Sequence, residues 1–339
     1  MNGVPLGGFF ALEIPDADGG ILQSWSEGRH VACFVNARSA LAALIAAERP
    51  RAVWLPAFLC GALADAVPAA LRRYYPVGPT LTPEVSALGN VQSGDMLIGI
   101  NYFSYPPAAD FIDFVAASPD VLFVEDCAHC LAPESPGWGG WRLFSPRKLL
   151  GVADGGILVA MRSGLQVPQP KIMGKFPESQ WLAPLLRFED ESQGLAGIWH
   201  VANQDKEAAM TVSDVAMTRL SHSLLALTDP KPLIQRRMTN FLTLEAELSP
   251  LLLSLGRRSG DAPFAFPIKL KENRRDEVLK RLHDQRIYAA VHWRDLPSPV
   301  EHFSAEHRLA RELISLPCDH RYRAEDMSRI IQVVVGALA

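Results

Sequence analysis

Short apolar runs alternate with longer stretches of helical period from residue 31 onward, and this alternation limits the fold more than any other feature of the 339-residue sequence. Four runs have the length and composition of buried strands, at 52–56, 95–101, 121–126 and 155–161. Repeated alternation of strands and helices is typical of a mainly parallel sheet with helices on both faces. We therefore expect an α/β fold.

The pattern changes along the second half of the chain. Residues 165–212 mix proline, glycine, tryptophan and acidic side chains without a sustained period, which predicts a long loop or lid. Strand-like runs at 264–270 and 287–293, with helical patterns between and after them, predict a smaller α+β domain. We expect a large domain over 1–235 and a small C-terminal domain over 236–339.

Composition excludes several classes of partner. A net charge of −4 and a pI near 6.2 give no basic footprint, so nucleic-acid binding is not expected. Five cysteines do not make a disulfide framework in a chain of this length, which favours a reducing compartment, the cytoplasm. The sequence has no leader-like start and no apolar stretch of about 18 residues, so neither export nor membrane insertion is expected.

Polar residues follow the predicted strands at the edge where open α/β sheets bind ligands. Asn36, Asn101 and Asp126 fall at such ends. Asp126 has two readings: it is a helix cap, or it is a buried carboxylate that holds a proton on a heterocyclic cofactor nitrogen. Lys148 also has two, a surface lysine or an amine nucleophile in a pocket.

Together, these two residues favour one cofactor. Pyridoxal phosphate chemistry requires a lysine, an acid for the pyridine nitrogen and donors for the phosphate, all near strand ends. The turn at 36–39, which precedes an alanine-rich helical stretch, could supply phosphate donors. Cys127 and Cys130 flank His129, and a zinc or redox pair competes with simple packing, but no second pair at ligand spacing is present. No metal site is predicted.

Several segments, taken in order, resemble the DegT/StrS family of sugar aminotransferases, which are pyridoxal-phosphate enzymes of fold type I. "VEDCAHCLA" is similar to the family's acidic segment, and "SPRKLLGVADGGILV" is similar to its lysine followed by an acidic-Gly-Gly strand. "NARSALAAL", "VWLPAFLCGAL", "SDVAMTRL" and "ISLPCDHRYRAEDMSRII" match further segments, so the resemblance spans nearly the whole chain. "GGFFALE", "NYF" and "SPRK" look more like a short, divergent branch associated with surface-polysaccharide gene neighbourhoods.

The resemblance implies roles for the residues around the cofactor ring. Lys148 would be the lysine that bonds covalently to the cofactor, and Asp126 the partner of the pyridine nitrogen. His129 would stand where the family has glutamine beside the phenolic oxygen. Leu143 replaces a phosphate-binding serine five residues before the lysine, whereas Ser145 matches the Ser-x-x-Lys spacing of other fold-type-I enzymes.

The resemblance also implies residues for the phosphate, the ring face and the substrate. Ser39 would hold the phosphate, with Arg38 in place of a glycine in the same turn. Cys60, with Phe58 nearby, occupies the position that often carries an aromatic ring over the cofactor. His292 is a candidate for substrate contact, against a structural role.

The implied reaction moves an amine from a donor, glutamate, to a keto group on a nucleotide-linked sugar, in a homodimer that builds each site from both subunits. The family's Asn-x-Arg clamp on the partner's phosphate is missing before residue 213. Two alternatives stay open: a pyridoxal-phosphate enzyme with another reaction, and a cofactor-free binding or regulatory protein. The retained lysine argues against the dehydratase branch, in which histidine replaces it.

Overall fold

The computed structural model describes residues 12–15, 17, 19–133, 135–174, 178–193, 198–255 and 262–339. Within that part of the chain, seven strands form one sheet in the order β1-β7-β6-β5-β4-β2-β3. The strands are β1 (Val31–Phe34), β2 (Val53–Pro56), β3 (Arg72–Tyr75), β4 (Met96–Ile100), β5 (Leu122–Asp126), β6 (Trp141–Phe144) and β7 (Gly156–Ala160). Only β7 runs antiparallel to its two neighbours, so the expected mainly parallel sheet is confirmed.

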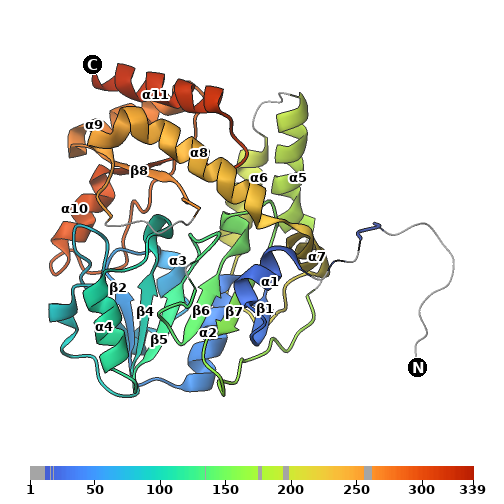
Figure 1. Ribbon diagram of the computed structural model, residues 1–339, viewed down its shortest axis with the longest axis vertical. Coiled ribbons are helices and arrows are strands. Elements are labelled where there is room, and N and C mark those ends of the chain that lie inside the picture. The colour runs from blue at the N-terminus through green and yellow to red at the C-terminus, as the bar shows by residue number, and fades with distance from the viewer. Residues whose placement is uncertain are drawn as a thin grey trace.

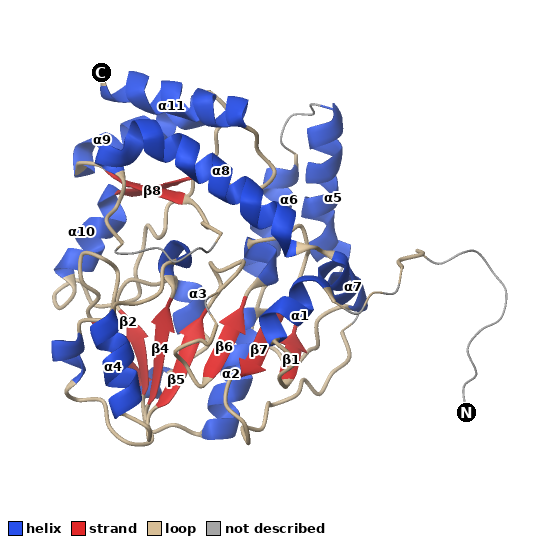
Figure 2. Ribbon diagram, viewed as in Figure 1, coloured by secondary structure: helices blue, strands red, loops and turns tan. Residues whose placement is uncertain are grey.

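Helices pack around this sheet (Figure 1, Figure 2). The first seven are α1 (Gly20–Ser26), α2 (Ala37–Glu48), α3 (Gly61–Ala64), α4 (Ala109–Ala117), α5 (Glu178–Gln193), α6 (Trp199–Ala209) and α7 (Arg219–Leu227). The C-terminal part has α8 (Pro230–Leu248), α9 (Glu272–Asp284), α10 (Ser304–Glu312) and α11 (Ala324–Leu338), with an antiparallel pair of strands, β8 (Phe266–Lys269) and β9 (Leu313–Leu316). None of the helices in the described ranges combines the length and apolar character that a bilayer crossing needs.

Both faces of the sheet are covered, which explains why its strands have continuous apolar runs. Side chains alternate between faces along a strand. Leu143 and Leu158 join the core under α2, whereas Phe144 and Val159 join a second core under α1 and α7. Every residue of β4 and β7 is consequently buried.

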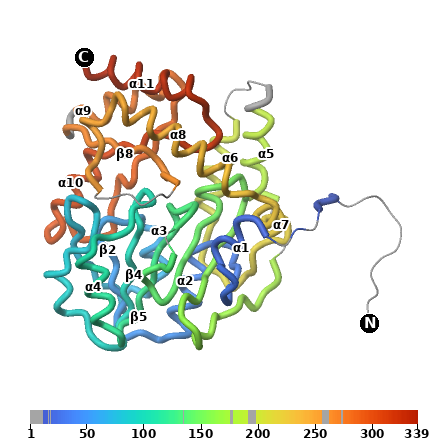
Figure 3. The backbone as a smooth tube through the Cα atoms, viewed as in Figure 1, coloured from blue at the N-terminus to red at the C-terminus, as the bar shows by residue number. Residues whose placement is uncertain are grey.

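The C-terminal part lies over the carboxyl ends of the parallel strands (Figure 1, Figure 3). It has a core of its own, in which Phe241 of α8 packs near Phe266 of β8. Leu253, Ala265 and Leu313 also join the core of the large sheet. The two parts therefore share a packed boundary directly above the edge where a ligand site is expected.

The predicted loop at 165–212 is wrong over most of its length, because α5 and α6 pack on each other there. Pro184 lies inside α5 and charged residues crowd its second half, so the helical period was hidden. The predicted strand at 287–293 is also wrong: it contributes only an isolated bridge from Ala290 to Ser315. After Cys60 the short helix α3 ends at Ala64, and the chain re-enters the sheet as β3.

Candidate active site

Four strand ends converge on one edge of the sheet. Asn36 follows β1, Asn101 follows β4, Asp126 ends β5, and Ser145 follows β6. A single 3-10 turn (Pro146–Lys148) comes next and carries the lysine back over this edge. The parallel arrangement therefore brings together the residues that the sequence singled out.

Two glycines allow the chain to enter β7 beside the start of α2. Gly155 has a φ of +131°, a region that side-chain-bearing residues rarely adopt. A Cβ on Gly156 would lie 2.1 Å from the carbonyl carbon of Asn36. Before them, the buried Asp154 accepts hydrogen bonds from Thr218 N (2.7 Å) and Thr218 Oγ1 (2.8 Å). Asp154 thus fixes the start of α7 and has a structural role.

The two successive carboxylates that end β5 point to opposite faces of the sheet. Glu125 pairs across strands with Arg142, whose Nε lies 2.8 Å from Glu125 Oε2, in a fully buried ion pair. Asp126 instead accepts a hydrogen bond from Ala128 N (2.8 Å), and no helix follows it, so the helix-cap reading is wrong. Burial raises the pKa of the Asp126 carboxyl, while the nearby Lys148 charge and the Ala128 N–H oppose that rise.

His129 lies buried beside this carboxylate. Its ring stacks on Phe264 with centroids 4.1 Å apart and planes at 5°. Burial, the Lys148 charge and neighbouring His292 hold the pKa of His129 well below its ordinary value, so the ring is neutral. Because Nδ1 accepts from the backbone N–H of Phe103 (3.4 Å), the remaining proton is on Nε2, which is a donor.

Lys148 lines a cavity of about 280 Å³ between the large sheet and the C-terminal part. The far wall comes from α8 and from segments around β8 and β9, including Phe264, His292 and Ser315. The lysine itself is half-buried. A primary amine at the wall of an enclosed cavity can reach a bound molecule as nucleophile or as base.

The structure places His292 opposite the lysine, in the wall of the same cavity. Its Nδ1 lies 2.8 Å from Ser315 Oγ, and its ring is 5.4 Å from that of His129. Burial and the Lys148 charge lower the pKa of His292 to about 3. It is therefore a neutral polar group facing the cavity.

Several charged residues of this cavity, among them Arg237, Asp319 and Arg321, had no role in the sequence interpretation. Arg237 of α8 is buried and donates to the carbonyls of Leu149 (3.0 Å) and Pro263 (3.2 Å), which ties the lysine turn to the C-terminal part. Asp319 accepts two hydrogen bonds of 2.8 Å from Arg321. Although burial favours its protonated form, Arg321 lowers the pKa of Asp319 to about 2. The segment "PCDHRYR" was quoted for its family resemblance, and only its position in the fold reveals these contacts.

The two predicted phosphate serines differ in how free they are. Ser39 Oγ is 3.0 Å from Asn36 Oδ1 and accepts from Ser213 N (3.0 Å), so its hydroxyl is engaged inside the fold. The buried Ser145 makes no side-chain hydrogen bond within the described residues. Arg38 donates from Nη1 to the carbonyl of Met210 (2.9 Å) at the end of α6. The Ser145 hydroxyl is therefore the less engaged of the two.

The predicted ring-face residues lie away from the cavity. Phe58 is fully buried, with ring centroids 5.8 Å from Tyr102 and 5.5 Å from Trp293. Cys60 caps α3 and is half-buried. Neither is among the residues that line the cavity, whose aromatic side chains include Phe264 and Tyr288.

Cys127 and Cys130 are packed in the core with Leu131 and Phe144. Within the described ranges, no three side chains of His, Cys, Asp or Glu gather as a metal site would require. The packing interpretation of the two cysteines therefore accounts for their position.

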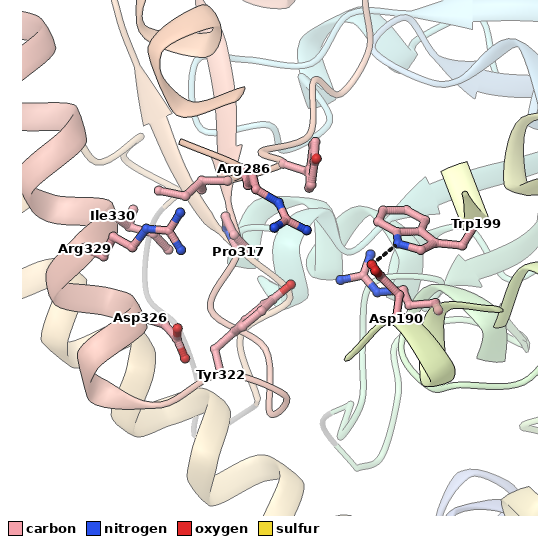
Figure 4. Close-up of a pocket in the computed structure, with 11 residues that line it drawn as sticks. Asp190, Trp199, Arg286, Pro317, Tyr322, Asp326, Arg329 and Ile330 are labelled. Atoms are coloured by element: carbon pink, nitrogen blue, oxygen red, sulfur yellow. Dashed lines mark hydrogen bonds between the residues drawn. The ribbon is translucent and has the colours of Figure 1, made fainter. Parts of the chain in front are cut away.

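A second cavity, of about 290 Å³, adjoins the first and shares Tyr288 and Pro317 with it. Trp199 of α6 lines one side and donates from Nε1 to Asp190 of α5 (2.8 Å). The opposite side comes from the C-terminal part: Arg286, Pro317, Tyr322, Asp326, Arg329 and Ile330 (Figure 4). The cavity next to the one beside Lys148 is thus lined by aromatic and cationic side chains.

No protein-family model matches this sequence, and no curated protein matches it. Solved structures do match over almost the whole chain. Spr1654 from Streptococcus pneumoniae, named as a sugar aminotransferase and solved in its PMP form, has a TM-score of 0.68 at 14% identity and covers 94% of this chain and 89% of its own.

Two further structures agree. A DegT DnrJ EryC1 StrS aminotransferase from Brucella abortus has a TM-score of 0.65 at 15% identity, covering 93% of this chain and 87% of that one. DesI, solved in the presence of its TDP-sugar product, has a TM-score of 0.65 at 16% identity, covering 95% and 86%. At these identities the likeness establishes a shared fold, that of fold-type-I aminotransferases.

Proposed function

We propose that this chain, which has the fold of the DegT/StrS sugar aminotransferases, is a pyridoxal-phosphate-dependent aminotransferase that acts on a nucleotide-linked keto sugar. Glutamate is the amino donor we expect. The observation that carries the proposal is the convergence of Lys148, which lines the cavity, and the buried Asp126. The two residues are 22 positions apart in the sequence, yet they lie within electrostatic reach of each other.

The residues present fit the cofactor. Asp126 is a buried carboxylate whose only described hydrogen bond is to Ala128 N, so one oxygen remains for a ring nitrogen. His129 carries a donor on Nε2 for a phenolic oxygen, and Ser145 has a free hydroxyl three residues before the lysine. Lys148 completes the set with an amine at the cavity wall.

When bound, pyridoxal phosphate supplies an electron sink for the charge that develops as a proton leaves the substrate carbon. The chain's own residues do the rest. Asp126 holds the ring nitrogen protonated, because a carboxylate buried away from water needs a cationic partner. Lys148 moves a proton between substrate carbon and cofactor carbon as general base and then general acid. The neutral His129 donates a hydrogen bond without adding charge.

The cavities support a substrate larger than an amino acid. The cavity beside Lys148 adjoins, at Tyr288 and Pro317, the cavity lined by Trp199, Arg286 and Arg329. Aromatic faces and guanidinium groups are the side chains that stack on bases and bind phosphates. This arrangement, together with the TDP-sugar in the DesI structure, is what supports the nucleotide-linked sugar.

A homodimer with shared sites belongs to the same proposal. Apolar side chains are exposed on and beside the α5–α6 pair: Ile172, Met173, Leu182, Leu185, Phe188 and Val201. A gathering of this kind favours a protein partner, and a second copy of the chain is the partner we propose. A cytoplasmic location and a role in surface-polysaccharide biosynthesis follow from the sequence expectations alone.

The test is a spectroscopic titration. Pyridoxal phosphate added to the purified protein should give a visible absorption band with a stoichiometry of one per chain, and glutamate should then discharge that band. Lys148→Ala should abolish the band, whereas Lys231→Ala, which removes an exposed lysine of α8, should keep it. A wild-type chain that gives no band at saturating cofactor would instead favour the cofactor-free binding protein.

A further inference from the structure

The α5–α6 pair builds a third cavity, of about 370 Å³, against the segment that carries Lys148. It shares Arg147, Leu150, Gly151 and Arg321 with the lysine cavity, so the two cavities are adjacent. The family resemblance gave no role to this region, which the sequence predicted to be a loop.

The lining of this cavity is strongly cationic. Arg147, Arg187, Lys206 and Arg321 come from four separate elements, and no acidic side chain is among the described residues that line it. Arg147 is paired with Glu207, and Arg321 with Asp319, both outside the lining. The described lining therefore has cationic side chains and no acidic ones.

Lys206 is the residue of this cluster that most strongly indicates a bound anion. It is only 8% exposed, and no hydrogen bond or ion pair joins its ammonium to the rest of the described chain. Burial and the nearby Arg147 lower the pKa of Lys206, although Glu207 opposes the shift. The Nε of Arg147 is also buried without a hydrogen-bond partner. A buried ammonium that lacks a partner, such as that of Lys206, is costly, and a bound anion would offset that cost.

The cluster lies near the first turn of α2. Glu207 of α6 pairs with Arg147, and Arg38, in the first turn of α2, donates to the carbonyl of Met210, which follows α6. The end of α6 therefore contacts cations of two separate elements.

We propose that the α5–α6 pair builds a phosphate-binding pocket beside Lys148, in which Lys206 and Arg147 bind a phosphate ester. The proposal rests on the proposed function for its ligand, which is the phosphate of the cofactor or of the substrate. Two or more cations at one concave site favour a multiply charged anion over a monovalent one.

The experiment measures the binding of inorganic pyrophosphate to the purified full-length chain by calorimetry at low salt. Lys206→Met should weaken binding about tenfold or more, the effect of losing one charge-assisted contact. Lys231→Met removes an exposed lysine outside the pocket and should leave the affinity unchanged. Lys206→Arg keeps the charge and should retain most of the wild-type affinity for pyrophosphate. If Lys206→Met folds poorly, Arg187→Gln provides a second variant.

Preloading separates the two sources of the phosphate. If the pocket serves the substrate, pyrophosphate should bind equally well after the chain is saturated with pyridoxal phosphate. If it serves the cofactor, saturation with pyridoxal phosphate should abolish pyrophosphate binding, whereas pyridoxal without its phosphate should not.

Equal affinity for pyrophosphate in wild type, Lys206→Met and Arg187→Gln would contradict the proposal that this pocket binds phosphate. That failure is distinct from failure of the proposed function, which is a missing cofactor band at Lys148. A cofactor absorption band at Lys148 without pyrophosphate binding that depends on these cations would support the aminotransferase function and reject the phosphate pocket.

Discussion

The edge of the sheet and the α5–α6 pair both border the segment that carries Lys148, yet they are built in different ways. At the sheet edge, each functional side chain follows a buried strand, and its position is set by hydrogen-bonded register with the next strand. On the α5–α6 pair, the facing groups come from elements far apart in sequence and meet through side-chain packing. Register fixes the reactive groups, whereas packing shapes the space around them.

This contrast predicts that variants at the sheet edge change the chemistry or the fold, whereas variants on the helical pair change substrate affinity. The largest effect should come from Lys148→Ala. Loss of a general base lowers rates by about 10²–10⁴-fold, and loss of the covalent attachment adds to this, so amination should become undetectable. Steady-state assay with keto-sugar nucleotides and glutamate is the measurement, with Lys231→Ala as the control. Activity in Lys148→Ala within tenfold of wild type would remove the lysine from the mechanism.

The second largest effect should come from loss of the buried ion pair between Glu125 and Arg142, next to Asp126. Arg142→Met leaves Glu125 charged and buried, with Asn101 as its remaining donor (2.8 Å), and should lower the free energy of unfolding by about 3–5 kcal/mol. Urea unfolding checks it. Glu125→Gln combined with Arg142→Met removes both charges and should recover much of the loss. A double variant no more stable than the single one would contradict this account of the pair.

Asp126→Asn should lower the activity of the enzyme but raise the stability of the cofactor-free protein. Amination should fall about 10²–10³-fold, because the amide cannot hold the proton on the ring nitrogen. Without cofactor, however, the variant should melt higher than wild type at pH 7. Burial raises the folded pKa of Asp126 above its unfolded value, so the ionised carboxylate destabilises the fold.

The pH dependence supplies the control for Asp126→Asn. The stability advantage of the variant should shrink as pH falls through the raised folded pKa, and should vanish below the unfolded value, where wild type is protonated in both states. Melting curves over pH 3 to 8 measure it. A wild type that is more stable than the variant at pH 7 would show that the carboxylate already has a compensating partner.

The smallest effect should come from the helical pair. Trp199 lines both the second and the third cavity. It stacks beneath Arg187, whose guanidinium carbon is 4.2 Å from the ring centroid. Trp199→Ala should raise the KM for a nucleotide-linked sugar about tenfold, the value of one stacking contact, with kcat changed little. His200→Ala, at the exposed neighbouring position, is the control. An equal fall in kcat would place Trp199 in the chemistry.

The sequence predicted the parts of the site that depend on register. The runs that became β4, β5 and β7 were visible because both their faces are buried, and the end of β5 located Asp126. The lysine followed from its spacing to that strand and from the family resemblance. The expected sheet with helices on both faces is confirmed for the same reason.

Other parts were hidden by local composition. The run that became β6 contains Arg142, which reads as exposed until its pair with Glu125 across the strands is known. Pro184 and acidic residues concealed α5. The cations around Lys206 lie between positions 147 and 321, a separation that no spacing rule connects.

The account rests on Lys148 as the residue that bonds the cofactor, and peptide mapping tests this most directly. The protein is incubated with pyridoxal phosphate, reduced with borohydride, digested and analysed by mass spectrometry. We expect one pyridoxyl group per chain, on Lys148, which lines the cavity with His292 and lies within electrostatic reach of Asp126. A reduced adduct spread over exposed lysines such as Lys231, with Lys148 unmodified, would contradict it.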